Sequence, residues 1–404
     1  MPKSFHKSSE VRLPQGFTLI ELLVSMSLSL ILLGTAFTLL DQLNNVADLA
    51  GTMGDVNENL RAGTNMIARD LSTAGAEVPL GGFPLPSGGT PCKAIKIPLP
   101  SWLTVQYFNP SCSGNMNVIT PGSGFGPTSG SGTSAIPTDT TTLISTNPIS
   151  QLDQYQLVSI TPVTTSGAYC CFSSGTTSVT ITVNPATNGG NLTAAGASQV
   201  VPGQLIMLSN TNSSVLLAVS SVTATTITFT TSDAANDPLG LNQFPLTASS
   251  PTSGTIGQLQ TKGISPAANF YPPTYAYPIT MTTYYLDNVS RPPTWMLMKQ
   301  VGTGAPLTGS PPTVPSVTPQ AVAMGINVLQ FSYSLSPAAV PTDPTRTFVS
   351  PYTPNTIRKV NLWLIAKADH SSRKTGQYYT NTAATSVVAQ NLAYYNKYGT
   401  GVPP

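Results

Sequence analysis

The pattern of apolar and polar residues divides the chain near residue 75. From residue 17 to residue 40, about 24 positions carry one charge, that of Glu21, and this length is enough for a membrane-spanning helix. Apolar residues then recur at a spacing of three or four, with one longer gap, at Leu40, Leu43, Val46, Leu49, Met53, Val56, Leu60, Met66, Ile67 and Leu71. This spacing predicts one continuous helix from Phe17 to about Ala74, ending at Gly75.

Beyond the helix, short runs rich in β-branched residues alternate with clusters of Gly, Pro, Ser and Asn, which predicts strands and turns. The runs are WLTVQYF, TTTLIS, QYQLVSITPV, SVTITV, GQLIMLS, SVLLAVSSV, TITFTT, YPITMTTYYLD, TWMLMKQ, GINVLQFSYSLS, IRKVNLWLIAKAD and TSVVAQNLAYYN. The expected fold class is therefore α+β, a long helix packed on a β-rich domain at 76–404. If SVTITV or TITFTT lay at a sheet edge, it could add a strand from a neighbour; otherwise both are ordinary sandwich strands.

Composition narrows the class of protein. Only 8% of the 404 residues are charged and the formal net charge is +2, so no basic surface for nucleic acid is expected. Low charge with abundant Ser, Thr, Asn and Gly favours an exported domain. The four cysteines, Cys92, Cys112, Cys170 and Cys171, allow three pairings. Cys92 with Cys112 is favoured because the two flank one expected strand unit.

The charges around the apolar run predict its orientation. Lys3, Lys7 and Arg12 precede the run, and Asp41, Asp48 and Asp55 follow it. The amino terminus is therefore expected in the cytoplasm, with everything from residue 41 onward exported. A secretory signal peptide would be shorter and followed by a small-residue cleavage site. A plain membrane anchor would leave Glu21 unexplained, because a carboxylate at the centre of a bilayer costs about 2.5 kcal/mol or more.

The segment G-FTLIELLVSMSLSLILLG resembles the amino-terminal segment of type IV prepilins and type II secretion pseudopilins. The resemblance implies a leader at 1–16, cleavage between Gly16 and Phe17 by a prepilin peptidase, and N-methylation of Phe17 by the same enzyme. Residues 17–40 and 41–75 then become the transmembrane and soluble halves of the pilin helix. Glu21 becomes the fifth mature residue, where its carboxylate can meet the amino terminus of a neighbouring subunit in one axial register.

Pieces of the carboxy-terminal half, including YYLD and VLQFSY, are similar to PilW-type minor pilins and to J-type minor pseudopilins, whereas residues 115–260 look like an enlarged insertion. The resemblance implies a minor pilin that initiates assembly or lies at the pilus tip. The expected location is the bacterial inner membrane, with a single span and a periplasmic domain, and then the pilus at the cell surface. The expected partners are the prepilin peptidase, other major and minor pilins, and the assembly platform of the inner membrane. The alternatives are a J-type pseudopilin of a type II secretion system and a tip adhesin that binds through the insertion.

No catalytic constellation is apparent, and the chain is not expected to be an enzyme. It has no GxSxG, HExxH or P-loop motif, and its two histidines, His6 and His370, have no cysteine near them in sequence, which disfavours a zinc site. His370 is expected in a solvated loop. Asp233, Asn236 and Asp237 could supply calcium ligands, but their spacing favours a turn. No cofactor or metal is expected.

Overall fold

The computed structural model describes residues 18–76, 78–79, 82–86, 95–108, 114–130, 133, 135–146, 155–161, 178–183, 192–193, 200–231, 233–243, 254–259, 272–290, 294–302, 319–335, 344–346, 356–372 and 375–392. Contacts divide the chain into two units. The first comprises residues 1–55 with 370–379, and the second comprises residues 56–369 with 380–404.

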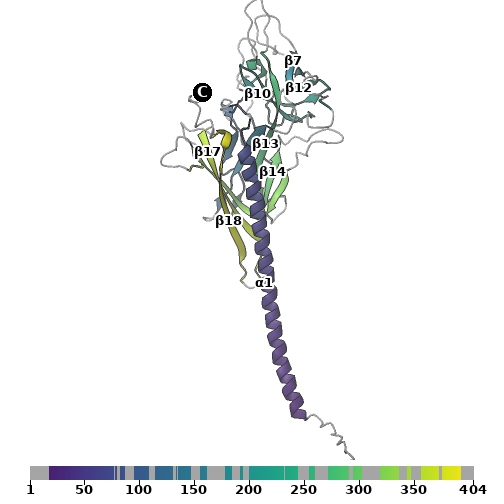
Figure 1. The fold of residues 1–404 in the computed structure, drawn as a ribbon, viewed down its shortest axis with the longest axis vertical. Coiled ribbons are helices and arrows are strands. Elements are labelled where there is room, and N and C mark those ends of the chain that lie inside the picture. Colours follow the sequence, from purple (N-terminus) through teal and green to yellow (C-terminus); the bar gives the residue numbers. More distant parts are fainter. Residues whose placement is uncertain are drawn as a thin grey trace, which may run out of the picture. The chain divides into compact units, whose positions relative to one another are not determined.

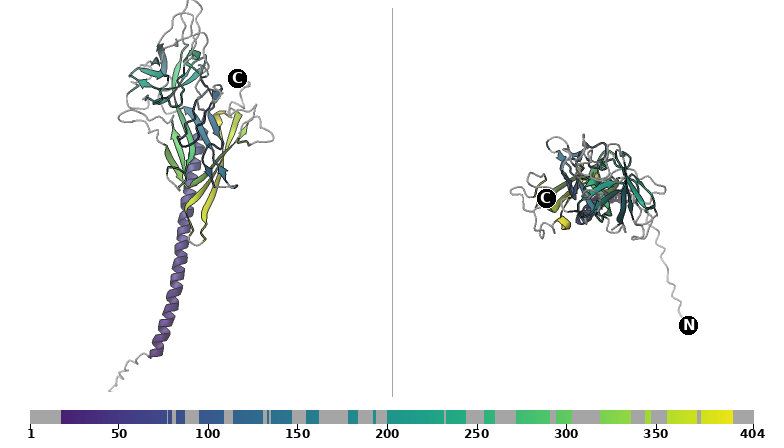
Figure 2. Two further views of the ribbon diagram at one scale, coloured as in Figure 1. Left: turned by 180° about the vertical axis from the view of Figure 1, so that it is seen from behind. Right: turned by 90° about the horizontal axis from the view of Figure 1, so that it is seen from above.

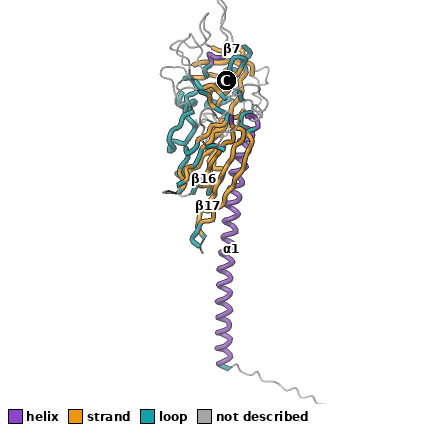
Figure 3. Tube along the Cα trace, turned by 90° about the vertical axis from the view of Figure 1, so that its left-hand side faces the viewer, coloured by secondary structure: helices purple, strands orange, loops and turns teal. Residues whose placement is uncertain are grey.

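One helix, α1 (Leu19–Thr73, 55 residues), occupies the amino-terminal part of the described chain (Figures 1 and 3). It confirms the predicted helix to within two residues at its start and one at its end. In the second unit the helix buries the stripe Val56, Leu60, Gly63, Ile67 and Leu71, spaced four, three, four and four residues apart. Met66, expected on this stripe, is exposed. Successive helical residues differ by about 100° in direction, so Met66 and Ile67 cannot share one narrow buried face.

Most strands of the second unit join one branched sheet of eleven strands. Its members are β3 (Ile119–Gly122), β6 (Thr140–Thr146), β7 (Tyr155–Thr161), β8 (Ser178–Val183), β9 (Leu205–Ser209), β10 (Ser214–Ala218), β11 (Ser221–Val222), β12 (Thr226–Thr230), β13 (Tyr275–Asp287), β14 (Met296–Val301) and β15 (Gln320–Met324). The long strand β13 is central, because it pairs antiparallel with β6, β7, β9 and β14 along its length. The α+β fold class predicted from the pattern is confirmed.

A second sheet has the order β16-β17-β18, with bounds Ile326–Leu335, Ile357–Ser371 and Tyr378–Val388 (Figure 2). Gly325 separates β15 from β16 with a φ of 73°, and a Cβ there would lie 2.7 Å from the Lys367 carbonyl oxygen. Only glycine fits this corner without strain. Two small ribbons, β1-β2 (Phe83–Pro84 with Asn115–Met116) and β4-β5 (Thr128–Ser129 with Ile136–Pro137), complete the described strands.

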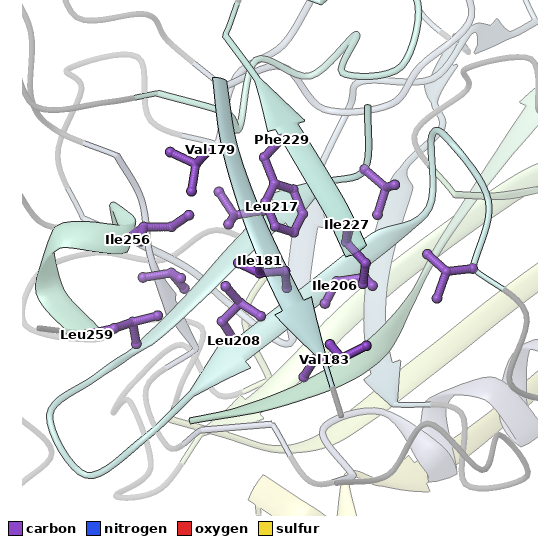
Figure 4. Packing of buried hydrophobic residues seen from close by; sticks show 14 of the residues in the cluster. Val179, Ile181, Val183, Ile206, Leu208, Leu217, Ile227, Phe229, Ile256 and Leu259 are labelled. Atoms are coloured by element: carbon purple, nitrogen blue, oxygen red, sulfur yellow. The ribbon is translucent and has the colours of Figure 1, made fainter. Parts of the chain in front are cut away.

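The middle of the chain contributes to two hydrophobic clusters. Figure 4 shows one of them, in which Ile181, Phe229, Leu208 and Leu217 of β8, β12, β9 and β10 pack together with Ile256 of the short 3₁₀ helix η3 (Ile256–Leu259). The other cluster joins parts of β6, β9, β10 and β13. Strands inside the expected insertion at 115–260 therefore pair and pack with β13, while the boundaries of the expected segments stay a prediction.

SVTITV (β8) lies between β7 and β12, and TITFTT (β12) lies between β8 and β11, so both are ordinary strands inside the sheet and the edge alternative does not apply. Other expectations about strands are wrong. WLTVQYF forms only an isolated bridge, from Tyr107 to Lys96, because Trp102 and Leu103 instead pack against Tyr285 and its neighbours. The five strands from β1 to β5 and the five-residue β15 were not anticipated.

Candidate functional site at the start of the helix

The helix begins with a capping box formed by two residues of the apolar segment. The Thr18 N–H and hydroxyl donate to Glu21 Oε2 at 3.0 and 2.9 Å, and the Glu21 N–H donates to Thr18 Oγ1 at 3.3 Å. Since α1 starts at Leu19, Thr18 is the N-cap and Glu21 is the third helical residue, the positions that such a box requires. The spacing T-x-x-E is a direct sequence signal for this role, which was not among the predictions made from the sequence.

The capping box uses one oxygen of the Glu21 carboxylate and leaves the other open. Glu21 is exposed, and its Oε1 has no hydrogen-bond partner among the described residues. The box fixes the carboxylate on the first turn of the helix. The geometry therefore presents a positioned acceptor beside an apolar surface, where a positively charged group from another molecule could bind.

Four hydroxyls inside the apolar run donate to carbonyl oxygens of the helix itself. Ser25 and Ser27 donate to the carbonyl oxygens of the residues three positions earlier at 2.9 and 2.8 Å. Thr35 does the same at 2.8 Å, and Thr38 donates to the carbonyls of Gly34 and Thr35. A hydroxyl without a partner in hydrocarbon would cost several kcal/mol, on the order of a lost hydrogen bond, so this arrangement suits a lipid environment.

The first 31 residues of α1 expose their apolar side chains. Leucine, isoleucine, valine, methionine and phenylalanine side chains between Leu19 and Leu49 are exposed. Within the described part of the chain, α1 is the helix long and apolar enough to cross a membrane, and its most apolar stretch has no buried residue. An exposed surface of this size needs lipid or other helices to cover it.

The soluble half of α1 is held by polar contacts as well as by its apolar stripe. Asp70 Oδ2 accepts hydrogen bonds from the Tyr284 hydroxyl of β13 and from Lys299 Nζ of β14, both at 2.6 Å. Tyr284 is fully buried, and burial, reinforced by its hydrogen bond to Asp70, raises its pKa. These contacts lock the last turns of the helix to the large sheet.

Side-chain amides fasten the rest of the soluble half. Asn381 of β18 donates to Asn57 Oδ1 at 2.6 Å. Asn59 Oδ1 accepts the Met324 N–H of β15 at 2.9 Å. Beyond the helix end, Asn391 donates to the Ala74 carbonyl oxygen at 2.8 Å. The helix is thus bound to both sheets of the second unit.

Most of the other expected site residues lie outside the part of the chain that the structure describes. Gly16 and Phe17 lie outside the described residues, as do all four cysteines, so the cleavage site and the disulfide pairings stay predictions. His370 belongs to β17 rather than to a loop, and its Nε2 lies 3.3 Å from Thr52 Oγ1. Within the described ranges, no group of three His, Cys, Asp or Glu residues could hold a metal ion.

The acidic residues considered for calcium form a turn. Asp233 accepts the Asn236 N–H at 3.2 Å, while Asp237 accepts the N–H groups of Gly240, Leu241 and Asn242 at 3.0, 2.9 and 2.7 Å. Burial raises the pKa of Asp237, even though these three donors favour its charged form. The oxygens of Asp237 therefore bind backbone donors and organise a loop.

Comparison with known proteins bears on the first helix. The family model described as "Prokaryotic N-terminal methylation motif" matches residues 12–37. No curated protein matches the chain. No solved structure matches it either.

The matched segment contains the capping box, the Glu21 carboxylate and most of the exposed apolar run. The motif implies processing by a prepilin peptidase and assembly into a pilus or pseudopilus, and the helix is consistent with anchoring in the inner membrane. Together they support a type IV prepilin-like protein, either a pilin or a pseudopilin.

Proposed function

We propose that the chain is a minor pilin of a type IV pilus, which helps to initiate assembly or forms part of the pilus tip. The observation that carries the proposal is the free oxygen of Glu21, held by the capping box at the start of an exposed apolar helix. When such helices bundle in a low-dielectric environment, the carboxylate needs a cation. After cleavage at Gly16, the amine of Phe17 on a neighbour would supply it, and only in one axial register.

The size of the β-rich domain supports a minor rather than a major subunit. The domain combines an eleven-stranded sheet with a three-stranded sheet. A subunit that repeats along a shaft must fit against copies of itself at every step, whereas one at an end meets neighbours on one side only. The proposal therefore places this chain at or near the tip, after its insertion in the inner membrane with the domain in the periplasm.

The first experiment determines the mature amino terminus. The full chain would be expressed with and without a prepilin peptidase, extracted from membranes, and analysed by intact mass and amino-terminal peptide sequencing. The expected product starts at N-methylated Phe17, and only when the peptidase is present. An intact leader, or a cut beyond Leu40, would refute the proposal.

A matched pair of variants separates the charge of Glu21 from its capping role. Glu21→Gln removes the charge but keeps an oxygen that can accept from Thr18. Thr18→Ala removes the capping hydroxyl, at a cost of about 1 kcal/mol to the helix, and leaves the charge in place. Both variants should be processed. Glu21→Gln should be lost from the assembled fibre, and Thr18→Ala should be retained; the opposite result would assign Glu21 to capping alone.

A J-type pseudopilin would share the motif and the helix, so co-purification decides between the two. Other minor pilins and a pilus fibre in the same preparation would support the pilus, whereas subunits of a type II secretion system would support the pseudopilin. The separate hydrophobic cluster of β8, β9, β10 and β12 keeps the tip adhesin as a further candidate, because a binding module needs its own core. No catalytic step belongs to the proposal.

A further inference from the structure

The last strand, β18, has an unusual surface for a folded domain. None of its 11 residues is buried and none is charged. Its neighbour β17, in contrast, buries alternate side chains and carries Arg358, Lys359, Lys367 and Asp369. Among the described strands β18 pairs with β17 alone, so it is an edge strand. Folded proteins usually protect such an edge with charges, prolines or a covering element.

The outer edge of β18 presents unpaired backbone groups. The Ala389 N–H donates to the Arg358 carbonyl at 3.2 Å, so residues of the same parity direct their N–H groups toward β17. The alternate residues, which include Ala384, Ser386 and Val388, direct their N–H groups away from β17. Among the described residues these N–H groups have no acceptor. A row of alternating donors and acceptors on an extended backbone is complemented by another extended strand.

One face of the same sheet offers a place for side chains of that strand. Ser386 Oγ donates to Asn361 Oδ1 at 2.8 Å, which sets these two residues opposite each other and Ala384 opposite Trp363. Trp363 is 40% exposed and faces Gln330 on the other side. A shallow hollow beside it is lined by Ser332, Asn361, Trp363, Ala384 and Ser386, and by Arg346, whose charge is paired with buried Asp139. The surface therefore suits an uncharged strand.

The direction of β18 restricts which strand can pair with it. Asn381 contacts Asn57, and Asn391, just beyond the strand, contacts Ala74, so β18 runs in the same direction as the soluble half of α1. Antiparallel pairing with the β18 of a second copy would turn the two helices in opposite directions, which two chains anchored in one membrane cannot adopt. A strand that pairs antiparallel with β18 must therefore come from a segment that runs antiparallel to its own subunit's helix.

We propose that the edge of β18 is an assembly surface, to which an uncharged strand of a neighbouring pilin-like subunit in the same membrane adds in antiparallel orientation. This inference rests on the proposed function, because it takes both subunits to be anchored by parallel helices. It deepens that function by adding a contact between the β-domains to the contact between the helices. Backbone pairing would give affinity, and the hollow beside Trp363 would give selectivity.

Site-specific photo-crosslinking tests the position and the direction of pairing. A benzophenone amino acid would replace Thr382, Ala384 or Ser386, one at a time, in the full chain in cells that produce the fibre. The expected cross-links, located by mass spectrometry, fall on one strand of another subunit that carries its own amino-terminal methylation motif. They should move backward along that strand as the probe moves forward. Thr228 of β12, which pairs with Thr180 and Ser221, is the control position and should give no such product.

Two proline variants separate pairing from folding. Ala384→Pro removes an outward N–H, whereas Ala383→Pro removes an N–H that faces β17. Ala384→Pro should keep the melting temperature of the detergent-solubilised full chain and reduce both cross-linking and incorporation into the fibre by about tenfold or more, the factor expected for a loss of about 1.4 kcal/mol. Ala383→Pro should lower the melting temperature.

Each outcome has one meaning. Three results would overturn the inference. The first is cross-linking between two copies of this chain in a pattern symmetric about Ala383, and the second is cross-linking to lipid alone. The third is full incorporation of Ala384→Pro into the fibre. If the chain is processed and incorporated but β18 gives no cross-link, the inference fails and the proposed function stands. If the chain is neither processed nor incorporated, the proposed function fails first.

Discussion

Removing the Asp70 carboxylate should loosen the helix from the sheet by a predictable amount. Asp70 is on the last two turns of α1, and its Oδ2 is the acceptor both for the Tyr284 hydroxyl and for Lys299 Nζ, each at 2.6 Å. Tyr284 is fully buried, and the side chains of Asp70 and Lys299 are each 21% exposed. In Asp70→Ala the buried hydroxyl of Tyr284 loses this acceptor.

The magnitude follows from the two groups that are left without a partner. A buried hydroxyl without an acceptor costs about 1–3 kcal/mol, and the partly buried ammonium of Lys299 adds about 1 kcal/mol. We therefore expect Asp70→Ala to lower the free energy of unfolding by about 3 kcal/mol. Tyr284→Phe removes the hydroxyl itself and so leaves no unpaired buried donor. It should lower the free energy of unfolding by about 1.5–2 kcal/mol, the range for a hydrogen bond to a charged group.

A double-mutant cycle tests this account. Denaturant unfolding of the full chain in detergent, followed by tryptophan fluorescence, gives the free energy for the wild type, both single variants and the double variant. Because Tyr284→Phe relieves the hydroxyl that Asp70→Ala leaves unpaired, the double variant should be no less stable than Asp70→Ala, with a coupling energy of about 1.5 kcal/mol. Additivity within about 0.5 kcal/mol would contradict the prediction, since it would show that the two residues act independently.

Three further predictions test the packing and the titration of the second unit. A Cβ on Gly63 would lie 3.0 Å from Leu297 Cδ2, so Gly63→Val should cost about 2 kcal/mol or more, while Gly63→Ala should stay within about 1 kcal/mol, as measured by denaturant unfolding. Burial raises the pKa of Tyr284 and Tyr333 above the value of the unfolded chain. The free energy of unfolding should therefore keep its full value below a pH of about 10 and fall above it, by up to about 1.4 kcal/mol per pH unit for each tyrosine. A free energy of unfolding that stays constant at alkaline pH would contradict this prediction. Asp139→Ala should cost about 3–5 kcal/mol by the same measurement, because the buried carboxylate accepts the Gly124 and Phe331 N–H groups and pairs with Arg346; a loss below 1 kcal/mol would argue against it.

Local patterns were enough to predict the long helix and most of the longer strands, although the expected closing strand TSVVAQNLAYYN overlaps β18 only at the last four residues of β18. The helix follows from its apolar run and its stripe, and SVTITV forms β8 over the same six residues because its Val and Ile alternate with Ser and Thr. The two-residue strands could not be predicted, since a pair such as Phe83–Pro84 has no period and becomes a strand only through its partner Met116. WLTVQYF shows the reverse: its propensity favours a strand, but Trp102 gains more by contacting Tyr285 edge-on at 6.4 Å between ring centroids.

Some features of the candidate site and of the edge strand could be predicted from neighbouring residues in the sequence, and others depend on contacts between distant residues. The capping box was readable, because Thr18 and Glu21 are three residues apart. The edge strand β18 could not be predicted, because an edge depends on the order of strands in a sheet. SVTITV and TITFTT, the two strands considered for an edge, are covered by neighbouring strands, whereas β18 pairs with β17 alone among the described strands. Similarly, Asp70 has no sequence signal for a partner on β13, 214 residues away.

The pairing of β13 changes how the adhesin alternative should be approached. Within the expected insertion, β6 pairs with six residues of β13 and β9 pairs with five, and Ile144 and Leu205 belong to the same cluster as Met281 of β13. Deleting 115–260 would therefore expose the central strand of the domain, and loss of fibres would follow whether or not the region binds a ligand. Only substitutions confined to exposed side chains of this region leave β13 paired, so binding and assembly have to be separated at its surface.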